Sequence, residues 1–226
     1  MLNDDLQTSK LRASKSPQDM EHFFQDDQAE FDNTMLLYSC AIKTVKTKLE
    51  VLNEELSLTG NRNPIEFIET RVKKPESIVL KLKKKQLPRT VQSVRENLND
   101  VAGVRVICAF IDDIYKVADM LTAQDDVQLL ITKDYIKNPK MNGYRSLHMI
   151  IEVPVYFSDH KEHVRVEVQI RTIAMDFWAS LEHQVKYKKN VADAEKIVYE
   201  LRACADVINQ TDHHMQSIRD SIVEID

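Results

Sequence analysis

Residues 163–171 alternate strictly between apolar and polar side chains, and this alternation constrains the fold more than any other feature. The apolar positions hold only valine and isoleucine, and the polar positions hold His163, Arg165, Glu167, Gln169 and Arg171. Successive side chains of a β-strand point to opposite faces of its sheet. The segment therefore predicts a sheet with one buried apolar face and one polar face, which either meets water or floors a binding site.

Two other segments favour the binding site. Residues 65–73 place Arg71 and Lys73 on one face and Val72 on the other, and residues 104–110 place Arg105 opposite the valines that flank it. Long cationic side chains on several strands of one sheet are what we expect beneath a large anionic ligand.

The remaining segments predict the elements around this sheet. Apolar residues at helical spacing mark long amphipathic helices over 31–56 and 197–225. The middle of the chain predicts strands over 65–73, 104–110, 127–136, 146–154 and 163–171, and helices over 75–85, 114–123 and 175–186. Asp112 is the expected cap of the second of these helices, and Phe177 and Trp178 are expected core residues of the third.

The pattern as a whole predicts an α+β fold: a sheet flanked by helices, with long helical extensions at both ends. We divide the chain into an N-terminal helical segment (1–62), a core (63–190) and a C-terminal helix (191–226). The apolar stripe of the last helix fits either packing on the same chain or a subunit interface.

Composition indicates which class of ligand the protein binds and which side chains can hold it. The net charge is −5, yet residues 71–89 hold eight basic side chains and one acidic one, which indicates a bound anion. The chain has three glycines, at 60, 103 and 143, too few and too scattered for a Walker A or dinucleotide loop, so lysine and arginine side chains must hold any phosphates.

The same composition indicates the compartment. The three cysteines, Cys40, Cys108 and Cys204, are far apart in apolar surroundings and read as reduced core residues. No apolar stretch is long enough to cross a membrane, and the acidic N-terminus does not resemble a signal peptide. We expect a cytoplasmic protein.

Two patterns suggest how a polyphosphate could be bound. Ser77, Lys81 and Lys84 share one face of the predicted helix 75–85 and could follow a phosphate chain, although lysines in such a row are also common on a solvated helix. Asp100 and Glu167 provide the one or two carboxylates that a phosphate-bound Mg²⁺ requires, although either could be a turn or surface acid.

Residues 134–148 form the most unusual segment, because they combine lysines with Tyr144 and His148 around one glycine. A tyrosine ring beside cations can stack on a nucleotide base while the cations reach its phosphates. A packed or surface tyrosine is the alternative.

Four motifs in order resemble the synthetase domain of the (p)ppGpp synthetases. They are RVKKPESI from Arg71, DVAGVR from Asp100, GYRSLH from Gly143 and EVQIRT from Glu167. The resemblance covers roughly residues 40–190, and with short helical ends the chain is similar to a small alarmone synthetase. It implies a mixed sheet related to nucleotidyltransferases, and transfer of the β,γ-pyrophosphate of ATP to the 3′-hydroxyl of GDP or GTP, giving AMP and ppGpp or pppGpp.

The resemblance also implies residue roles. Arg71 and Arg105 would sandwich the adenine, Asp100 and Glu167 would hold Mg²⁺ with Glu167 as the base for the 3′-hydroxyl, and Tyr144 would stack on guanine. The ATP site would comprise Arg71, Lys73, Ser77, Lys81, Lys84 and Arg105. The acceptor site would comprise Lys133, Lys140, Tyr144, His148, Gln169 and Asp176, the last at a position where some relatives carry asparagine.

Two expectations, on hydrolysis and on assembly, and one rival interpretation complete the prediction. The hydrolase domain of the larger relatives is built on a His-Asp pair, and no such dipeptide occurs here, so we expect synthesis without hydrolysis. The resemblance further implies a homotetramer assembled through terminal helices. The rival interpretation is a non-catalytic module that binds single-stranded RNA along the basic residues 71–89, and the sequence leaves GDP and GTP equally possible as acceptor.

Overall fold

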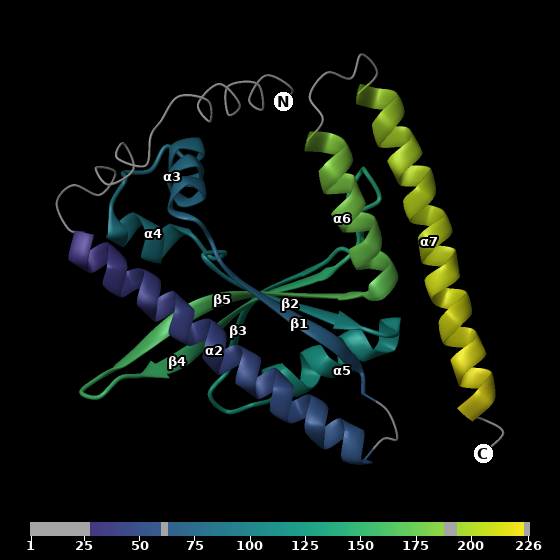
Figure 1. Ribbon diagram of the computed structural model, residues 1–226, viewed down its shortest axis with the longest axis horizontal. Helices are drawn as coiled ribbons and strands as arrows, with labels where there is room; N and C mark the ends of the chain where they lie inside the picture. The colour runs from purple at the N-terminus through teal and green to yellow at the C-terminus, as the bar shows by residue number, and fades with distance from the viewer. Residues whose placement is uncertain (1–27, 60–62, 188–193, 224–226) are drawn as a thin grey trace.

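The computed structural model describes residues 28–59, 63–187 and 194–223. Its elements, labelled as in Figure 1, are α2 (Gln28–Thr59), β1 (Ile65–Val72), α3 (Pro75–Lys84), α4 (Val91–Asn97), β2 (Ala102–Cys108), α5 (Ile111–Thr122), β3 (Gln128–Asp134), β4 (Leu147–Tyr156), β5 (Lys161–Thr172), α6 (Ile173–Tyr187) and α7 (Ala194–Val223). The predicted boundaries at 62/63 and 190/191, residues 1–27 and Ile225 lie outside the described residues.

The five described strands form one mixed sheet in the order β1-β2-β5-β4-β3. β2 and β5 are parallel, and the other neighbouring pairs are antiparallel. Figure 1 shows α2 running along the sheet, with α3 and α6 on opposite sides of the view and α7 beside α6. This arrangement confirms the predicted α+β class with a mixed sheet and helices at both ends.

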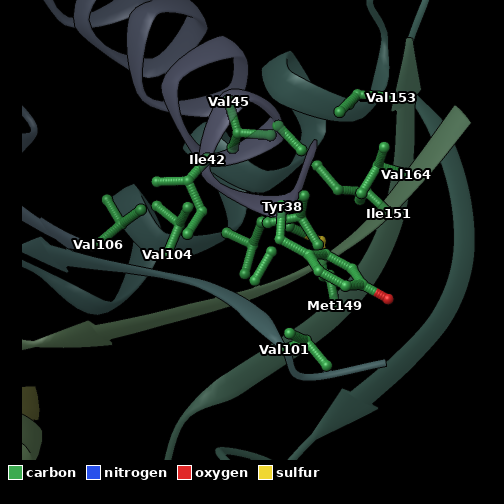
Figure 2. Packing of buried hydrophobic residues seen from close by; sticks show 14 of the residues in the cluster. Tyr38, Ile42, Val45, Val101, Val104, Val106, Met149, Ile151, Val153 and Val164 are labelled. Carbon is green, nitrogen blue, oxygen red and sulfur yellow. The ribbon is translucent and has the colours of Figure 1, made fainter. Parts of the chain in front are cut away.

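One face of the sheet is the core. Figure 2 shows Ile42 and Val45 of α2 packed onto Val104, Val106 and other inward-facing strand residues. Ile114, Val117 and Leu121 of α5 belong to the same cluster and are fully buried. Because helices cover this face, the valines of the alternating strands are buried beneath them, and the polar residues lie on the opposite, more open face.

Several local predictions were wrong in detail. α4 was missed; Thr90 caps it by accepting a hydrogen bond from the Ser93 amide. Asp112 does not cap α5, because the helix starts at Ile111 with Phe110 in the cap position, two residues before the predicted cap. Phe177 is 58% exposed, whereas Trp178 is buried as expected. Cys204 is exposed rather than in the core.

The apolar stripe of α7 only partly faces the protein body. Among the helix residues whose burial is described, Ala205 and Asp212 are buried, and Leu201 and Ile208 are half-buried. Met215, Ile218 and Ile222 are exposed, because the contact line is rotated around the helix from the predicted stripe. Among the described residues, no helix combines the length and apolarity that crossing a membrane requires.

Candidate active site

Strand register collects the predicted site residues into a row across the polar face. Arg105 is opposite Gln169, which is opposite His148, which is opposite Lys133, so four adjacent strands each contribute one predicted residue at the same level. Glu69 of β1 completes the row beside Arg105. Side chains directly opposite on neighbouring strands lie about 4.5–5.5 Å apart at Cβ, so residues 15 to 64 positions apart in sequence become neighbours.

A second row lies next to the first. Arg71 of β1 is opposite Gly103 of β2, which is opposite Glu167 of β5. Gly103 has no side chain, so the space between Arg71 and Glu167 stays open. This opening forms part of a cavity of about 480 Å³ lined by Glu69, Thr70, Arg71, Asp100, Gly103, Val104, Arg105, Glu167 and Gln169.

Asp100 lies at the edge of this cavity and is held by two lysines. Its Oδ2 accepts hydrogen bonds from Lys73 Nζ at 2.7 Å and from Lys81 Nζ at 2.6 Å. Burial by itself would raise the pKa of Asp100, but the two ammonium groups outweigh burial and hold its pKa below the usual value. The carboxylate is therefore ionised at neutral pH.

The other oxygen of Asp100 fits a cation. Oδ1 is buried and has no hydrogen-bond partner among the described residues, and Asp100 lines the same cavity as Glu167. The described residues contain no group of three or more histidine, cysteine or acidic side chains able to hold a metal. Two carboxylates suit a Mg²⁺ ion that takes its other ligands from phosphates and water.

Glu167 lies between two cavities. Besides the first, it lines a second of about 210 Å³, together with Ile131, Lys133, Tyr135, Lys140, His148 and Ile150. Its Oε2 accepts a hydrogen bond from Gln169 at 2.9 Å, and its Oε1 is 3.5 Å from His148 Nδ1. Burial would raise the pKa of Glu167, yet these neighbours outweigh burial and lower its pKa. The ionised carboxylate can therefore accept a proton from a group in either cavity.

Aromatic rings and a lysine border the second cavity. The Tyr144 hydroxyl is 2.8 Å from His148 Nε2. Tyr135 makes edge contacts with both rings, at centroid distances of 6.1 Å to Tyr144 and 5.2 Å to His148. Lys140 Nζ lies 4.6 Å from the centre of the Tyr135 ring and 4.5 Å from that of Tyr144. An aromatic surface beside a cation can bind a base and a phosphate together.

Asp176 connects the two sides of the site. Its Oδ1 lies 3.6 Å from Arg105 and 3.4 Å from Arg171. Arg171 is only 3% exposed and donates to the Tyr144 hydroxyl at 3.3 Å and to Gln169 Oε1 at 2.9 Å. Asp176 thus neutralises the buried Arg171 guanidinium group next to Tyr144 and also reaches Arg105 in the larger cavity.

Six predicted residues do not line either cavity. Four of them, Lys73, Lys81, Tyr144 and Asp176, are bonded to residues that do, which leaves two. Ser77 is half-buried and Lys84 is exposed on α3, and neither is among the residues that line them. Conversely, our site prediction omitted Arg171 and Tyr135. The position of Arg171 on the polar face of the 163–171 alternation was the signal that could have identified it, and Tyr135 was already within the unusual segment 134–148.

The chain matches a known family over this site. Residues 70–192, slightly more than half of the chain, match the family described as the region found in RelA and SpoT proteins. GTP pyrophosphokinase YwaC of Bacillus subtilis (strain 168) is 44% identical over 193 residues, which cover 85% of this chain and 92% of the relative. GTP pyrophosphokinase YjbM of the same organism is 34% identical over 198 residues, covering 88% and 92%.

Solved structures agree in fold. Small alarmone synthetase 2 from Bacillus subtilis has a TM-score of 0.77 at 42% identity, covering 85% of this chain and 99% of that one. Small alarmone synthetase 1 from the same organism, bound to its product pppGpp, has a TM-score of 0.77 at 33% identity, covering 85% and 98%. The chain therefore belongs to the RelA/SpoT family and, within it, to the small alarmone synthetases.

Proposed function

We propose that this protein is a (p)ppGpp synthetase, which transfers the β,γ-pyrophosphate of ATP to the 3′-hydroxyl of GDP or GTP and releases AMP. The observation that carries the proposal is the position of Glu167, an ionised carboxylate that lines both a cavity bordered by arginines and a second cavity bordered by Tyr135, His148 and two lysines. Two substrates in these cavities would meet at Glu167.

ATP occupies the larger cavity in this proposal. Arg71 and Arg105 line it and can hold the adenine between planar guanidinium groups. Lys73 and Lys81 lie beside it on Asp100 and can exchange that carboxylate for phosphate oxygens. Ser77 and Lys84 lie about one turn to either side of Lys81 on α3 and would contact phosphate oxygens outside the cavity.

Mg²⁺ would be held by Asp100 and Glu167, which fits the partnerless oxygen of Asp100. When bound, the ion neutralises charge on the ATP phosphates and on the departing group. The protein supplies the remaining positive charge through its lysines and arginines, which lie on the rigid sheet and on α3.

The acceptor nucleotide occupies the smaller cavity. Tyr144 stacks on the guanine, which requires Lys140 to leave its present position over the tyrosine ring and turn toward the phosphates. Lys133 of β3 and His148 of β4 line the cavity. Gln169 and Glu167 both belong to β5, the next strand, and Gln169 donates a hydrogen bond to Glu167. Asp176 does not contact the nucleotide in this proposal: it pairs with the Arg171 guanidinium group, which donates to the Tyr144 hydroxyl.

The chemical step then needs one proton transfer and one displacement. Glu167 takes the proton of the 3′-hydroxyl, and the resulting oxygen attacks the β-phosphorus of ATP. The bond between that phosphorus and the α,β-bridging oxygen breaks, and the bridging oxygen leaves with AMP. Positioning the two nucleotides in line and neutralising charge account for most of the acceleration in such transfers.

Assembly and compartment are further parts of the proposal. The exposed apolar residues Met215, Ile218 and Ile222 of α7 support a homotetramer that buries them between subunits. The three cysteines are free thiols, which, with the use of ATP, supports a cytoplasmic location. We also propose that the protein synthesises (p)ppGpp without hydrolysing it.

Chromatographic separation of nucleotides tests the proposal. Purified protein is incubated with ATP, Mg²⁺ and either GDP or GTP, in parallel with Glu167→Gln. We expect AMP to appear in step with ppGpp or pppGpp, and the variant to lose about 10²–10⁴-fold in rate, as is usual when a general base is removed. No product with either acceptor would refute the proposal and return attention to RNA binding, which a salt-dependent affinity for single-stranded RNA would reveal.

A further inference from the structure

The loop that carries Tyr144 is fastened to the C-terminal helix by Arg145. The Arg145 side chain is only 10% exposed. Its Nη1 donates to the carbonyl oxygen of Ala205 in α7 at 3.1 Å and to that of Gly143 at 3.2 Å, and its Nη2 donates to Asp206 Oδ1 at 3.0 Å. One guanidinium group thus joins the loop backbone to two consecutive residues of α7.

Other contacts seat the same loop. Gly143 has a φ of +88°, and a Cβ at this position would lie 2.4 Å from the Cβ of Ala205, so the loop backbone touches the helix surface directly. Arg202 of α7 donates to the Met141 carbonyl oxygen at 3.4 Å. Asn142 donates to Glu182 of α6 at 2.9 Å. The backbone from 141 to 145 is therefore held from one side by α6 and α7.

The opposite side of this loop carries the acceptor groups. Tyr144 lies between Gly143 and Arg145, and the Lys140 amide donates to the Tyr144 carbonyl oxygen at 3.2 Å. Displacing the loop from α7 would move Tyr144 and Lys140 relative to the sheet residues His148 and Glu167.

We propose that Arg145 is a positioning residue for the acceptor nucleotide, and that it holds the Tyr144 loop in its binding position through α7. This inference rests on the proposed function. It predicts a selective effect, because the residues lining the ATP cavity come from β1, β2, β5 and residue 100, and include none from the loop or α7. Loss of Arg145 should therefore weaken the acceptor and spare ATP.

The protein contains a natural reporter of this contact. Trp178 is its single tryptophan. Its indole Nε1 donates to the Leu201 carbonyl oxygen of α7 at 3.0 Å, and its ring centre is 6.5 Å from that of Tyr144. Its fluorescence thus reports on the junction of loop, α6 and α7 without requiring turnover.

The matched control is Arg219, an arginine of α7 whose described hydrogen bonds go to α5 and to α7 itself, not to the Tyr144 loop. It forms two 2.8 Å bonds with Asp112 at the start of α5. Arg219→Ala removes an anchor of α7 and leaves the Arg145 contacts in place, so it separates loop positioning from general docking of the helix.

The experiment compares Arg145→Ala, Arg219→Ala and the unchanged protein. We expect Arg145→Ala to raise KM for GDP and GTP about tenfold or more, the factor that corresponds to one lost charge-assisted hydrogen bond, with KM for ATP within about twofold of the original. The Trp178 emission should shift in Arg145→Ala and stay unchanged in Arg219→Ala. Asp206→Ala, which removes one exposed partner, should change the same constants less and serves if Arg145→Ala does not fold.

Two results would overturn the inference: equal increases in KM for ATP and for the acceptor, or the same acceptor defect in Arg219→Ala. Calorimetric titration of GDP into the same proteins tests it independently of catalysis. If the unchanged protein binds GDP but makes no product, the proposed function fails; if it turns over normally and Arg145→Ala binds GDP equally well, the positioning role fails alone.

Discussion

Replacing Asp100 with asparagine tests the electrostatics of the larger cavity, which we propose binds ATP. Lys73 and Lys81 both donate to one oxygen of Asp100, and the side chains are 13%, 35% and 18% exposed for Lys73, Lys81 and Asp100. Hydrogen bonds to charged groups contribute about 1.5–3 kcal/mol, which we apply to Lys73. The more exposed Lys81 pair is screened by water and contributes roughly 0–1 kcal/mol.

Asparagine keeps one acceptor oxygen but loses the negative charge between two ammonium groups. We therefore expect Asp100→Asn to lower the free energy of unfolding by about 1.5–4 kcal/mol at pH 7. For a chain of this size that corresponds to a fall in Tm of roughly 3–16 °C. Asp159→Asn is the control, because Asp159 is fully exposed and should leave the Tm almost unchanged.

The pH dependence gives the sharper test. The pKa of Asp100 is lower in the folded protein than its ordinary value of 3.8, because its lysine partners outweigh the opposing effect of burial. Its stabilising contribution is therefore complete above the unfolded pKa and is lost as pH falls through the folded pKa. Urea denaturation followed by circular dichroism should show a constant gap between Asp100→Asn and the unchanged protein from pH 7 to 5, which narrows below pH 4.

Two outcomes would refute this reasoning: equal stability at pH 7, or a gap that stays constant down to pH 3. Inorganic triphosphate without Mg²⁺ provides a second reading. Since the lysines of Asp100→Asn have no carboxylate to give up, triphosphate should stabilise the variant at least as much as it stabilises the unchanged protein, whereas turnover of ATP should be lost.

Further predictions concern the loop, the metal, the assembly and the base. Gly143→Ala should cost about 1–3 kcal/mol in urea unfolding, because φ is +88° and the new Cβ would overlap Ala205; unchanged stability would contradict the close contact. Chelation with EDTA should abolish product formation, and Mg²⁺ should restore it; full activity in EDTA would exclude the proposed role of the carboxylates. Ile218→Glu should convert a tetramer to smaller species in light scattering, and a monomer before substitution would refute the assembly. Because the pKa of Glu167 lies below 4.5, kcat/KM should show no acid limb attributable to this base above pH 4.5.

The sequence contained most of the secondary structure and the identity of the polar face. Alternation in β5 is unambiguous because each face of the strand has one environment: Val166 and Val168 lie in the core, and Glu167 lines the cavity. Motif resemblance supplied the proposed residue roles, and the register of the strands places several of these residues in two adjacent rows.

What the sequence could not provide depends on distant contacts. The pairing of Lys73 and Lys81 with Asp100 requires α3 to pack back beside the start of β2, and neither the strand order nor this packing is encoded in local spacing. The short helix α4 was missed because it spans only seven residues. The contact line of α7 was misjudged because Asp212, a carboxylate that accepts from buried Thr172, faces inward where an apolar residue was expected.

The rows across the sheet restrict how this chain can vary by insertion and deletion. Adding one residue inside β2 or β5 would exchange the faces of every side chain beyond it, so valines would enter the site while Arg105 or Glu167 entered the core. Such a change would remove packing and chemistry in the same event, and no compensating point substitution could restore both. β3 is different: it is an edge strand, exposed along most of its length, and its pairing with β4 already shifts register between Leu129 and Ile131. Length variation among relatives should therefore concentrate at the register shift of β3, ahead of Lys133, and in connections other than 134–146, while β2 and β5 keep a fixed number of residues.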